Sequence, residues 1–270
     1  MRLQIEHHTE YTYSDKVFLE PHYLQLYPQP RPYFKVERHD LTIDPIPTGK
    51  SERLDVENNL IGQCWFTEPV SALKVQSLLE VDSTSFNPYN FLIDNDITSN
   101  APAPFLRVPV ESASEFDTWI ADIHGSAGAD TLKFVTNLNE QIHDNWVHEI
   151  REEPSILTPG VCFAAKSGSC RDLSWMMMVG LRKSNIPSRF VSGYAFNPEL
   201  GEGHELHAWV EAWLPGAGWV GLDPSSGLLA DETYIPIHTS ADPKNTLPVI
   251  GNYRGYANSS LSSKVLIRLL

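Results

Sequence analysis

Three residues of this sequence have the types and the spacing needed for nucleophilic catalysis, and the first of them is Cys170. It follows Gly168-Ser169 and precedes apolar residues spaced three and four apart. A thiol attacks only as thiolate, and an ordinary pKa of roughly 8.5 leaves few thiols ionised at neutral pH. The first turn of a helix favours an anion, because its backbone N–H groups are unpaired and lie at the positive end of the dipole. We therefore expect Cys170 to start a helix as an activated nucleophile, with those N–H groups available to an oxyanion.

The second and third residues are a base, His207, and an orienting acid, Asp223. A cysteine nucleophile needs a group that moves protons during the reaction, and imidazole titrates closest to neutral pH. His207 opens an alternating segment, residues 207–213, and Asp223 ends the next one, residues 219–223. A carboxylate on the second imidazole nitrogen fixes its tautomer and direction. The three residues are thus predicted to form a catalytic triad.

The turn between those two segments decides whether Asp223 can reach His207. If residues 214–218 form a five-residue loop, Trp213 lies opposite Trp219. Asp223 then lies diagonal to His207 on the same face, at roughly 7–8 Å between backbones. A slip of one residue would turn Asp223 to the other face. The triad therefore requires an odd loop or a bulge, and the glycines of this turn are suited to either.

Hydrophobic patterns divide the remainder of the chain into three parts. Residues 1–110 carry short alternating segments broken by Pro, Gly, Asn and Asp, which predict an all-β sandwich or barrel. Residues 111–235 change to helical spacing and then back to strands, as expected for a catalytic core. Residues 236–270 form a C-terminal extension. Its apolar end, residues 264–270, is expected to return to the N-terminal β domain as an added strand, because such a strand needs a partner edge.

Three segments carry a resemblance to the transglutaminase-like superfamily. They are Gly168-Ser-Cys170-Arg-Asp-Leu, then Leu181-Arg-Lys-Ser-Asn-Ile-Pro-Ser-Arg-Phe-Val-Ser-Gly-Tyr194, then His207-Ala-Trp-Val-Glu-Ala-Trp-Leu-Pro-Gly-Ala-Gly-Trp-Val-Gly-Leu-Asp-Pro224. Their order and spacing resemble the core of that superfamily. The front of the chain, Glu6-His-His-Thr-Glu-Tyr-Thr-Tyr13, is similar to the β-rich region that precedes this core in bacterial members.

The resemblance implies a papain-like α+β core that transfers an acyl group from a carboxamide through a thioester. By position in the motif it makes Cys170 the nucleophile, His207 the base and Asp223 the third member. An aromatic residue upstream of the nucleophile often contributes to the oxyanion hole in relatives, and Trp146 is the candidate here. The implied partner is a peptide or protein substrate.

Other residues that could carry chemistry have simpler interpretations. Cys64 and Cys162 lack a neighbouring base and are interpreted as structural, Cys64 in an apolar strand and Cys162 as an ordinary thiol that could be exposed. His204 and His207 form an H-x-x-H pair, but no carboxylate set accompanies it, so a zinc site is not expected. No calcium loop is present in the sequence, and no cofactor or metal is implied. Trp209 is a candidate for the wall of a substrate cleft, although simple packing across the hairpin explains it equally well.

Composition excludes several classes of partner. Twenty Lys and Arg against 34 Asp and Glu give a net charge of −14, which disfavours nucleic acid and anionic membranes. No stretch approaches the roughly 20 apolar residues that span a bilayer. With three cysteines and no signal-like N-terminus, the chain is expected to be cytoplasmic. Its oligomeric state cannot be predicted from these features.

Three functions remain open at this stage. The leading prediction is a peptidase or amidase that hydrolyses an acyl-enzyme at Cys170. Transamidation of a protein glutamine to an amine is the second, because the same triad serves both acceptors. A non-catalytic scaffold of the same fold is the third, and the intact set of Cys170, His207 and Asp223 argues against it.

Overall fold

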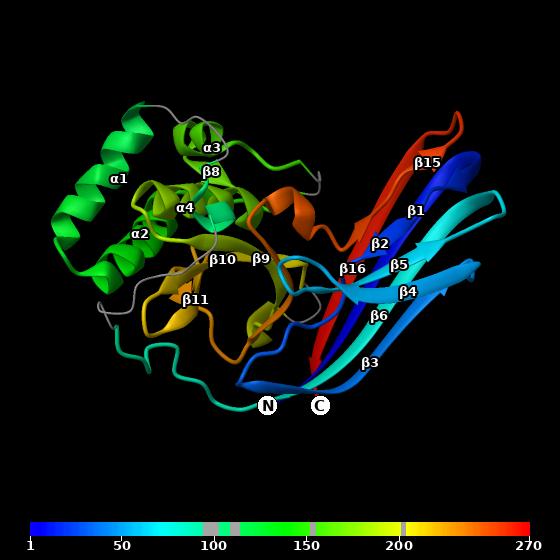
Figure 1. Cartoon of the computed structure of the whole chain (residues 1–270), viewed down its shortest axis with the longest axis horizontal. Helices are drawn as coiled ribbons and strands as arrows, with labels where there is room; N and C mark the ends of the chain where they lie inside the picture. The colour runs from blue at the N-terminus through cyan, green and yellow to red at the C-terminus, as the bar shows by residue number, and fades with distance from the viewer. Residues whose placement is uncertain (94–102, 109–113, 152–154, 201–203) are drawn as a thin grey trace.

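The fold has a β-rich half and a mixed half that share an interface. The computed structural model describes residues 1–93, 103–108, 114–151, 155–200 and 204–270. In Figure 1 the long strands gather on one side of the molecule and the helices on the other, with the two termini close together at the edge of the β-rich half. The predicted class, α+β with an all-β region ahead of a mixed core, is confirmed.

The β-rich half consists of two antiparallel sheets and is a sandwich rather than a barrel. One sheet has the order β15-β1-β6-β3, with β16 also paired to β1, and the other has the order β14-β2-β5-β4. The strands are β1 (Arg2–Leu19), β2 (His22–Leu24), β3 (Phe34–Asp44), β4 (Gly49–Leu54), β5 (Leu60–Trp65), β6 (Val70–Ser83), β14 (Val249–Ile250), β15 (Tyr253–Arg254) and β16 (Ser259–Leu269).

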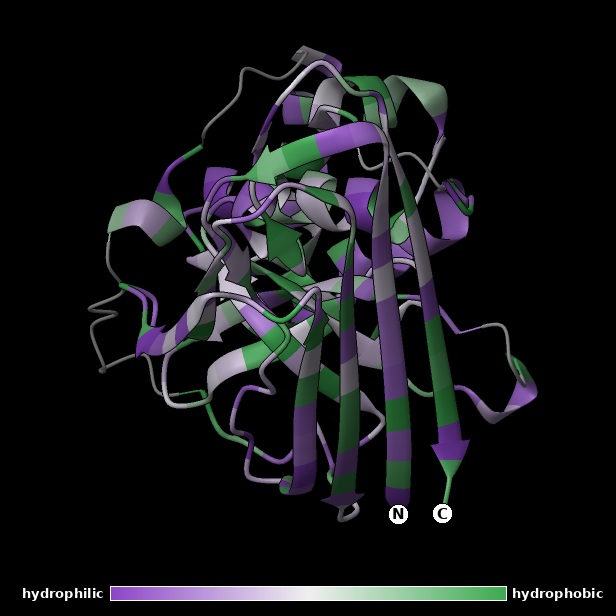
Figure 2. Cartoon of the chain, turned by 90° about the vertical axis from the view of Figure 1, so that its right-hand side faces the viewer, coloured by the Kyte–Doolittle hydropathy of each residue, from purple (hydrophilic) through white to green (hydrophobic). Residues whose placement is uncertain are grey.

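Alternation along these strands explains why the two sheets pack face to face. In β1 the residues Leu3, Ile5, His7 and Thr9 are buried, while the residues between them are half-buried. The same alternation appears as hydrophilic and hydrophobic bands along the strand that begins at the N-terminus in Figure 2. Side chains of a strand point to opposite faces in turn, so one apolar face is available for the core.

The mixed half is built on a five-stranded antiparallel sheet of order β12-β11-β10-β9-β13. Its strands are β9 (Ser188–Ala195), β10 (His207–Leu214), β11 (Gly218–Asp223), β12 (Leu228–Leu229) and β13 (Tyr234–Ser240). The short strands β7 (Val147–His148) and β8 (Ser167–Gly168) form a separate parallel pair. Since β13 continues to Ser240, the core sheet extends past residue 235, the end predicted for the core.

Four α-helices cover one face of this sheet, with α4 in contact with β10 and β9. They are α1 (Ser114–Ala127), α2 (Thr131–Asn145), α3 (Pro159–Ala165) and α4 (Cys170–Lys183), and the 3₁₀ turns are η1 (Ala103–Leu106), η2 (Pro198–Leu200) and η3 (Pro243–Thr246). Every residue of α4 from Asp172 to Arg182 is buried, because the sheet lies on one side and the other helices on the opposite side. None of the helices within the described ranges is long and apolar enough to cross a membrane.

The last part of the chain ties the two halves together. After β13, the strands β14, β15 and β16 all belong to the sandwich, and β16 pairs with β1 from Leu3↔Leu269 to Tyr13↔Ser259. Tyr194 and Ile235 of the core sheet pack into the same apolar cluster as the sandwich interior. The boundary predicted near residue 110 falls in 109–113, outside the described residues.

Candidate active site

Cys170 is the first residue of α4, and a buried carboxylate holds this end of the helix. Ser169 is the N-cap, with extended φ −75° and ψ 169°. Asp172 accepts hydrogen bonds from the Ser169 N–H at 2.8 Å and from the Ser169 hydroxyl at 2.7 Å. It also accepts from the Leu157 N–H at 2.6 Å and from Arg151 at 2.7 Å. Four hydrogen bonds from three residues to Asp172 therefore hold the start of the helix that carries the thiol.

Gly168, two residues before the thiol, is required by close packing. A Cβ at this position would lie 2.9 Å from Asp172 Cβ and 3.0 Å from Cys162 Sγ. Its carbonyl accepts the Glu149 N–H at 2.9 Å, which keeps the β7–β8 pair beside the helix start. A larger residue here would therefore move Asp172 or the strand pair, and with them Cys170.

The hairpin of β10 and β11 has the parity that a triad requires. Leu214 pairs with Gly218 and Trp213 with Trp219, so the loop holds three residues rather than the five expected. Both numbers are odd, and the register is the expected one. Gly216 and Gly218 adopt φ of 83° and 78°, which L-residues rarely do. The continued register leaves His207 and Asp223 on the same face.

His207 and Asp223 form a direct hydrogen bond, Nε2 to Oδ2 at 2.8 Å. The carboxylate of Asp223 is fully engaged, because Tyr234 donates its hydroxyl to Oδ2 at 2.8 Å and Ser225 donates its N–H and hydroxyl to Oδ1 at 2.9 and 2.6 Å. With Nε2 bound to Asp223, the ring nitrogen left for Cys170 is Nδ1. Cys170 is half-buried and hydrogen-bonded to His207.

The pKa values within this group have moved toward an ion pair. Burial alone would raise the pKa of the Cys170 thiol, but hydrogen bonds from His148 and His207 outweigh it and lower that pKa to about 6. Burial opposes a charged His207, yet the Asp223 carboxylate raises the imidazole pKa well above its usual value. The same attraction holds the pKa of Asp223 far below its usual range, against its burial. At neutral pH the site thus favours thiolate beside imidazolium.

His148 is a second histidine at the thiol, and the sequence analysis missed it. His148 lies on β7 and pairs with Gly168 of β8, and Gly168 is two residues before Cys170. The side chain of His148 hydrogen-bonds the thiol. The ring is exposed at the surface rather than buried. Its only signal in the sequence is its place two residues after Trp146, the residue predicted to contribute to the oxyanion hole. Tyr234 and Ser225, which orient Asp223, were missed as well, and only the Asp223-Pro-Ser225 turn hinted at the serine.

The indole N–H of Trp146 is bonded away from the thiol, which corrects the prediction that it contributes to an oxyanion hole. Its indole N–H donates to the Cys162 carbonyl at 3.1 Å, and the residue is buried. The ring packs against Trp119 and Phe163, and the Lys166 ammonium lies 3.6 Å from its centroid. A donor engaged in this way cannot also reach an oxyanion beside Cys170.

Trp209 does not line an open cleft, contrary to the interpretation that made it a cleft candidate. It is 1% exposed, and its ring contacts Tyr234 edge to face at 5.3 Å. It also stacks beside His207, with ring centroids 6.3 Å apart. Because it fills the space behind the imidazole and the tyrosine that binds Asp223, its role is to support the triad.

The other two cysteines are both buried. Burial raises the pKa of Cys64 to about 11 and that of Cys162 to about 12. The expectation of an exposed, ordinary Cys162 is therefore wrong, because this residue lies in the middle of α3 with its thiol packed against Gly168. His204 bonds Asn197 through Nε2 and does not combine with His207. Within the described ranges no cluster of three or more His, Cys, Asp or Glu is arranged to hold a metal ion.

Comparisons with known proteins agree with this architecture. Residues 3–82 match the bacterial transglutaminase-like N-terminal region, and residues 117–224 match the transglutaminase-like superfamily. The crystal structure of a candidate cysteine protease from Cytophaga hutchinsonii superimposes with a TM-score of 0.73 at 18% identity, over 99% of this chain and 90% of that one. The combination of sandwich and core is therefore a fold that both proteins share.

Two relatives in sequence differ in how much of the chain they match. An uncharacterised protein of Mycobacterium tuberculosis is 27% identical over 285 residues, which is 97% of this chain and 90% of that protein. A protein-glutamine gamma-glutamyltransferase of Pseudomonas aeruginosa is 39% identical over 70 residues, only 23% of this chain and 10% of that protein. Together with the superfamily match, these likenesses support a thiol-dependent enzyme in general terms.

Proposed function

Because this chain belongs to the transglutaminase-like superfamily, we propose that it transfers an acyl group from a carboxamide or peptide bond to water through a thioester at Cys170. It is then a peptidase or amidase whose substrate is a peptide or protein. Cys170 is the nucleophile, His207 the general acid and base, and Asp223 the residue that orients His207. The single observation that supports this most is the 2.8 Å bond between His207 and Asp223 beside a thiol whose pKa is lowered to about 6.

Acylation begins with attack of the Cys170 thiolate on the carbonyl carbon of the scissile bond. The π electrons move onto the carbonyl oxygen, giving a tetrahedral oxyanion. The backbone N–H groups at the start of α4 and the side chain of His148 are the donors that we assign to this oxyanion, because both lie at the thiol. Collapse of the intermediate breaks the C–N bond, and the His207 imidazolium gives its proton to the departing amine.

Deacylation reverses these roles with water as the acceptor. Neutral His207 removes a proton from water as the oxygen attacks the thioester, and the Cys170 thiolate leaves. The products are a carboxylic acid and the regenerated thiolate–imidazolium pair. Asp223 remains ionised throughout, since four hydrogen bonds hold its carboxylate as an acceptor.

Transamidation is the second function that we consider, and one observation favours it. The relative from Pseudomonas aeruginosa that matches 70 residues is named a protein-glutamine gamma-glutamyltransferase. An amine in place of water would attack the same thioester, and the same base would remove its proton. The triad serves both acceptors equally, so the acceptor must be identified by experiment.

Mass spectrometry of products separates these functions. The purified chain is incubated with a glutamine-containing peptide library in heavy-oxygen water, with and without n-butylamine, alongside the Cys170→Ala variant. Hydrolysis introduces heavy oxygen into the new carboxylate, whereas transamidation adds butylamine to a glutamine side chain. We expect the heavy-oxygen product. A folded wild-type chain that yields neither product would contradict the proposal and favour a scaffold. A Cys170→Ala variant as active as wild type would contradict the assignment of Cys170 as the nucleophile.

A further inference from the structure

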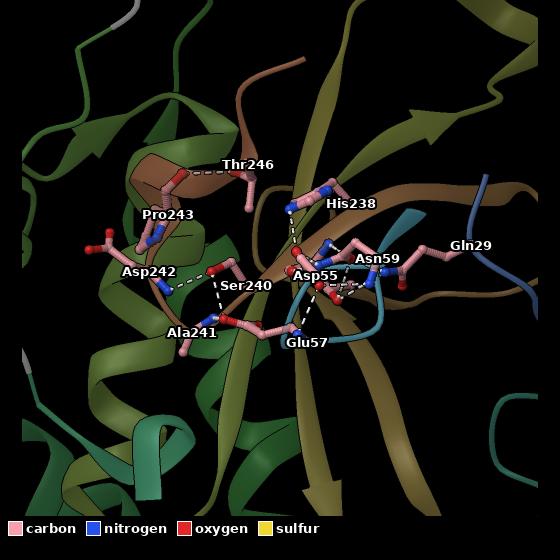
Figure 3. Close-up of polar contacts among 11 residues, drawn as sticks. Gln29, Asp55, Glu57, Asn59, His238, Ser240, Ala241, Asp242, Pro243 and Thr246 are labelled. Carbon is pink, nitrogen blue, oxygen red and sulfur yellow. Dashed lines mark hydrogen bonds and ion pairs between the residues drawn. The ribbon is translucent and has the colours of Figure 1, made fainter. Parts of the chain in front are cut away.

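A polar cavity lies away from the triad, where the sandwich meets the edge of the core sheet. It has a volume of about 270 Å³. The turn between β4 and β5 forms one wall, and β13 with η3 forms another (Figure 3). Its described lining is Tyr23, Gln25, Asp55, Val56, Glu57, Ile61, His238, Ser240, Asn245 and Ile250.

Two buried side chains in this lining have a polar atom without a partner among the described residues. They are Gln25, 7% exposed, through Oε1, and His238, 1% exposed, through Nδ1. The other nitrogen of His238, Nε2, lies 3.8 Å from Asp55 Oδ2. Because a carboxylate can only accept a hydrogen bond, we assign the imidazole proton to Nε2, the nitrogen nearer Asp55, and a lone pair to Nδ1. The cavity therefore has two buried acceptors that lack a donor, a costly arrangement unless a ligand supplies one.

The charge of the lining favours a cation. Asp55 and Glu57 both contribute carboxylates, and none of the described lining residues is Lys or Arg. Both carboxylates are already held in place, since Asp55 accepts from Glu57 N–H and Asn59, and Glu57 accepts from Ser240 and the Ala241 N–H. Burial is the main cause that raises the pKa of Glu57, and the nearby Asp55 raises it further. A positive group between them would relieve both effects.

The apolar part of the lining limits what that cation can be. Ile61 and Ile250 are half-buried apolar residues of the same cavity, and Val56, which is 99% exposed, adds an apolar residue at its rim. An ammonium group has three donors and no acceptor, which suits two carboxylates, an amide oxygen and an imidazole lone pair. A short hydrocarbon stem would contact the three aliphatic residues. Within the described lining no group of three ligands is arranged for a metal ion.

We propose that this cavity between the β4–β5 turn and β13 is a binding site for a primary alkylammonium group with a short apolar stem. Gln25 Oε1 and His238 Nδ1 accept N–H donors of this group, and the carboxylates of Asp55 and Glu57 supply the negative charge of the site. The group belongs either to a free small amine or to a lysine side chain of a bound peptide. The site is separate from the proposed acyl transfer and does not depend on it.

Titration calorimetry on the Cys170→Ala variant tests binding without turnover. The probes are n-butylammonium, its neutral analogue n-butanol, and N-acetyl-lysine N-methylamide. We expect saturable binding of n-butylammonium, none of n-butanol, and a change in the Nδ1 nitrogen resonance of His238 on binding. Binding of the lysine derivative as well would identify a lysine side chain as the source, and its failure to bind would identify a free amine. Absence of saturable n-butylammonium binding, or equal binding of n-butanol, overturns the proposal.

Three variants on the Cys170→Ala background separate ligand contacts from structural effects. Gln25→Met removes the unpartnered acceptor at nearly constant shape, so it should leave the thermal midpoint of the free protein unchanged or higher while weakening binding about tenfold. Glu57→Gln removes one negative charge and should weaken binding to a similar extent. Glu10→Gln makes the same charge change on β1, outside the cavity, and should bind as tightly as the parent. Unchanged affinity in both Gln25→Met and Glu57→Gln would refute the site.

Discussion

At the scale of single residues, three identical thiols differ widely in acidity because their surroundings differ. Cys64 and Cys162 lie among apolar atoms, and burial raises their pKa to about 11 and about 12. Cys170 is also penalised by burial, but two histidines donate to it and its pKa falls to about 6. Reactivity in this protein is thus set by hydrogen-bond donors at the sulfur rather than by exposure alone.

Selective alkylation of Cys170 follows from these values. With a pKa of about 6, roughly nine-tenths of this thiol is ionised at pH 7, whereas a thiol of pKa 11 is almost wholly protonated. The rate of modification by iodoacetamide should rise with pH to a half-maximum near pH 6 and then level off. Peptide mapping should find Cys170 labelled alone. His207→Ala should shift the profile to higher pH, and labelling of Cys162 at pH 7 would contradict the assignment.

His148 should be needed for catalysis although it lies outside the triad. His148→Leu removes a donor from the thiol, so the pKa of Cys170 should rise and kcat should fall by roughly 10²-fold, as when an oxyanion donor is removed. His148→Gln retains an N–H donor, so its kcat and the pKa of its Cys170 should lie closer to the wild-type values than those of His148→Leu. Comparison of pH–rate profiles and kcat for the two variants measures this. A leucine variant with wild-type kcat and an unshifted profile would exclude the role.

At the scale of elements, the position of the thiol depends on how α4 begins. Asp172 is fully buried inside the first turn and connects it to the Leu157 N–H and to Arg151. The position of the base depends on the β10–β11 hairpin, because its loop of three residues places His207 and Asp223 on the same face. Each of the side chains proposed for catalysis is therefore placed by the end of a regular element, where backbone geometry is well defined.

Replacing Asp172 by Ala should lower both stability and activity. The change leaves the buried Ser169 N–H and the partly buried Leu157 N–H without their acceptor and removes one ionic partner of Arg151, which costs about 3 kcal/mol or more in the free energy of unfolding. Asp172→Asn keeps an acceptor oxygen and should lose less. Urea denaturation with a kcat measurement on the folded variant tests this.

The loss of stability caused by Asp172→Asn should also depend on pH. The pKa of Asp172 is lowered in the folded state; burial opposes this, but hydrogen bonds led by that from Ser169 prevail. Its carboxylate therefore contributes stability above its ordinary pKa and loses it as the pH falls through the folded-state pKa. The difference in stability between wild type and Asp172→Asn should shrink in acid. A difference that stays constant down to low pH would contradict this origin.

At the scale of the whole molecule, the sandwich and the core are joined by buried polar groups as well as by apolar packing. Glu211 on β10 binds Arg31 from the N-terminal half at 2.6 Å and Arg189 on β9 at 2.6 Å. The side chain of Asn59, from the β4–β5 turn, donates to the Thr239 carbonyl of β13 at 2.9 Å. Because Glu211 and His207 both lie on β10, one strand contributes to the junction and to the candidate active site.

Breaking the Glu211 pairings should weaken the whole fold. Glu211→Ala leaves two largely buried guanidinium groups without their carboxylate, and loss of one partner from a buried pair costs about 3–5 kcal/mol. Glu211→Gln keeps hydrogen-bond acceptance and should lose less. Urea unfolding followed by tryptophan fluorescence measures both. A Glu211→Ala variant within experimental error of wild type would show that these two ion pairs do not contribute to the stability of the junction.

Local patterns in the sequence were enough to predict the class of fold and the two catalytic elements. Alternation in segments such as β1 and β6 reflects a strand with one face in the core, and the spacing after Cys170 reflects a helix. The odd parity of the hairpin followed from counting residues between Trp213 and Trp219. These features depend only on residues that are close in the chain. The periods of strand and helix therefore reveal them in the sequence without the tertiary structure.

Only the tertiary structure decided which other side chains meet at the thiol and which do not. His148 reaches Cys170 because β7 and β8 pair in parallel, and Tyr234 reaches Asp223 because β13 lies in the same sheet. Trp146 and Trp209, favoured by residue type, point into packed interiors instead. Contacts between segments distant in sequence, and the direction of each side chain, follow from how whole elements pack. No local period encodes that packing.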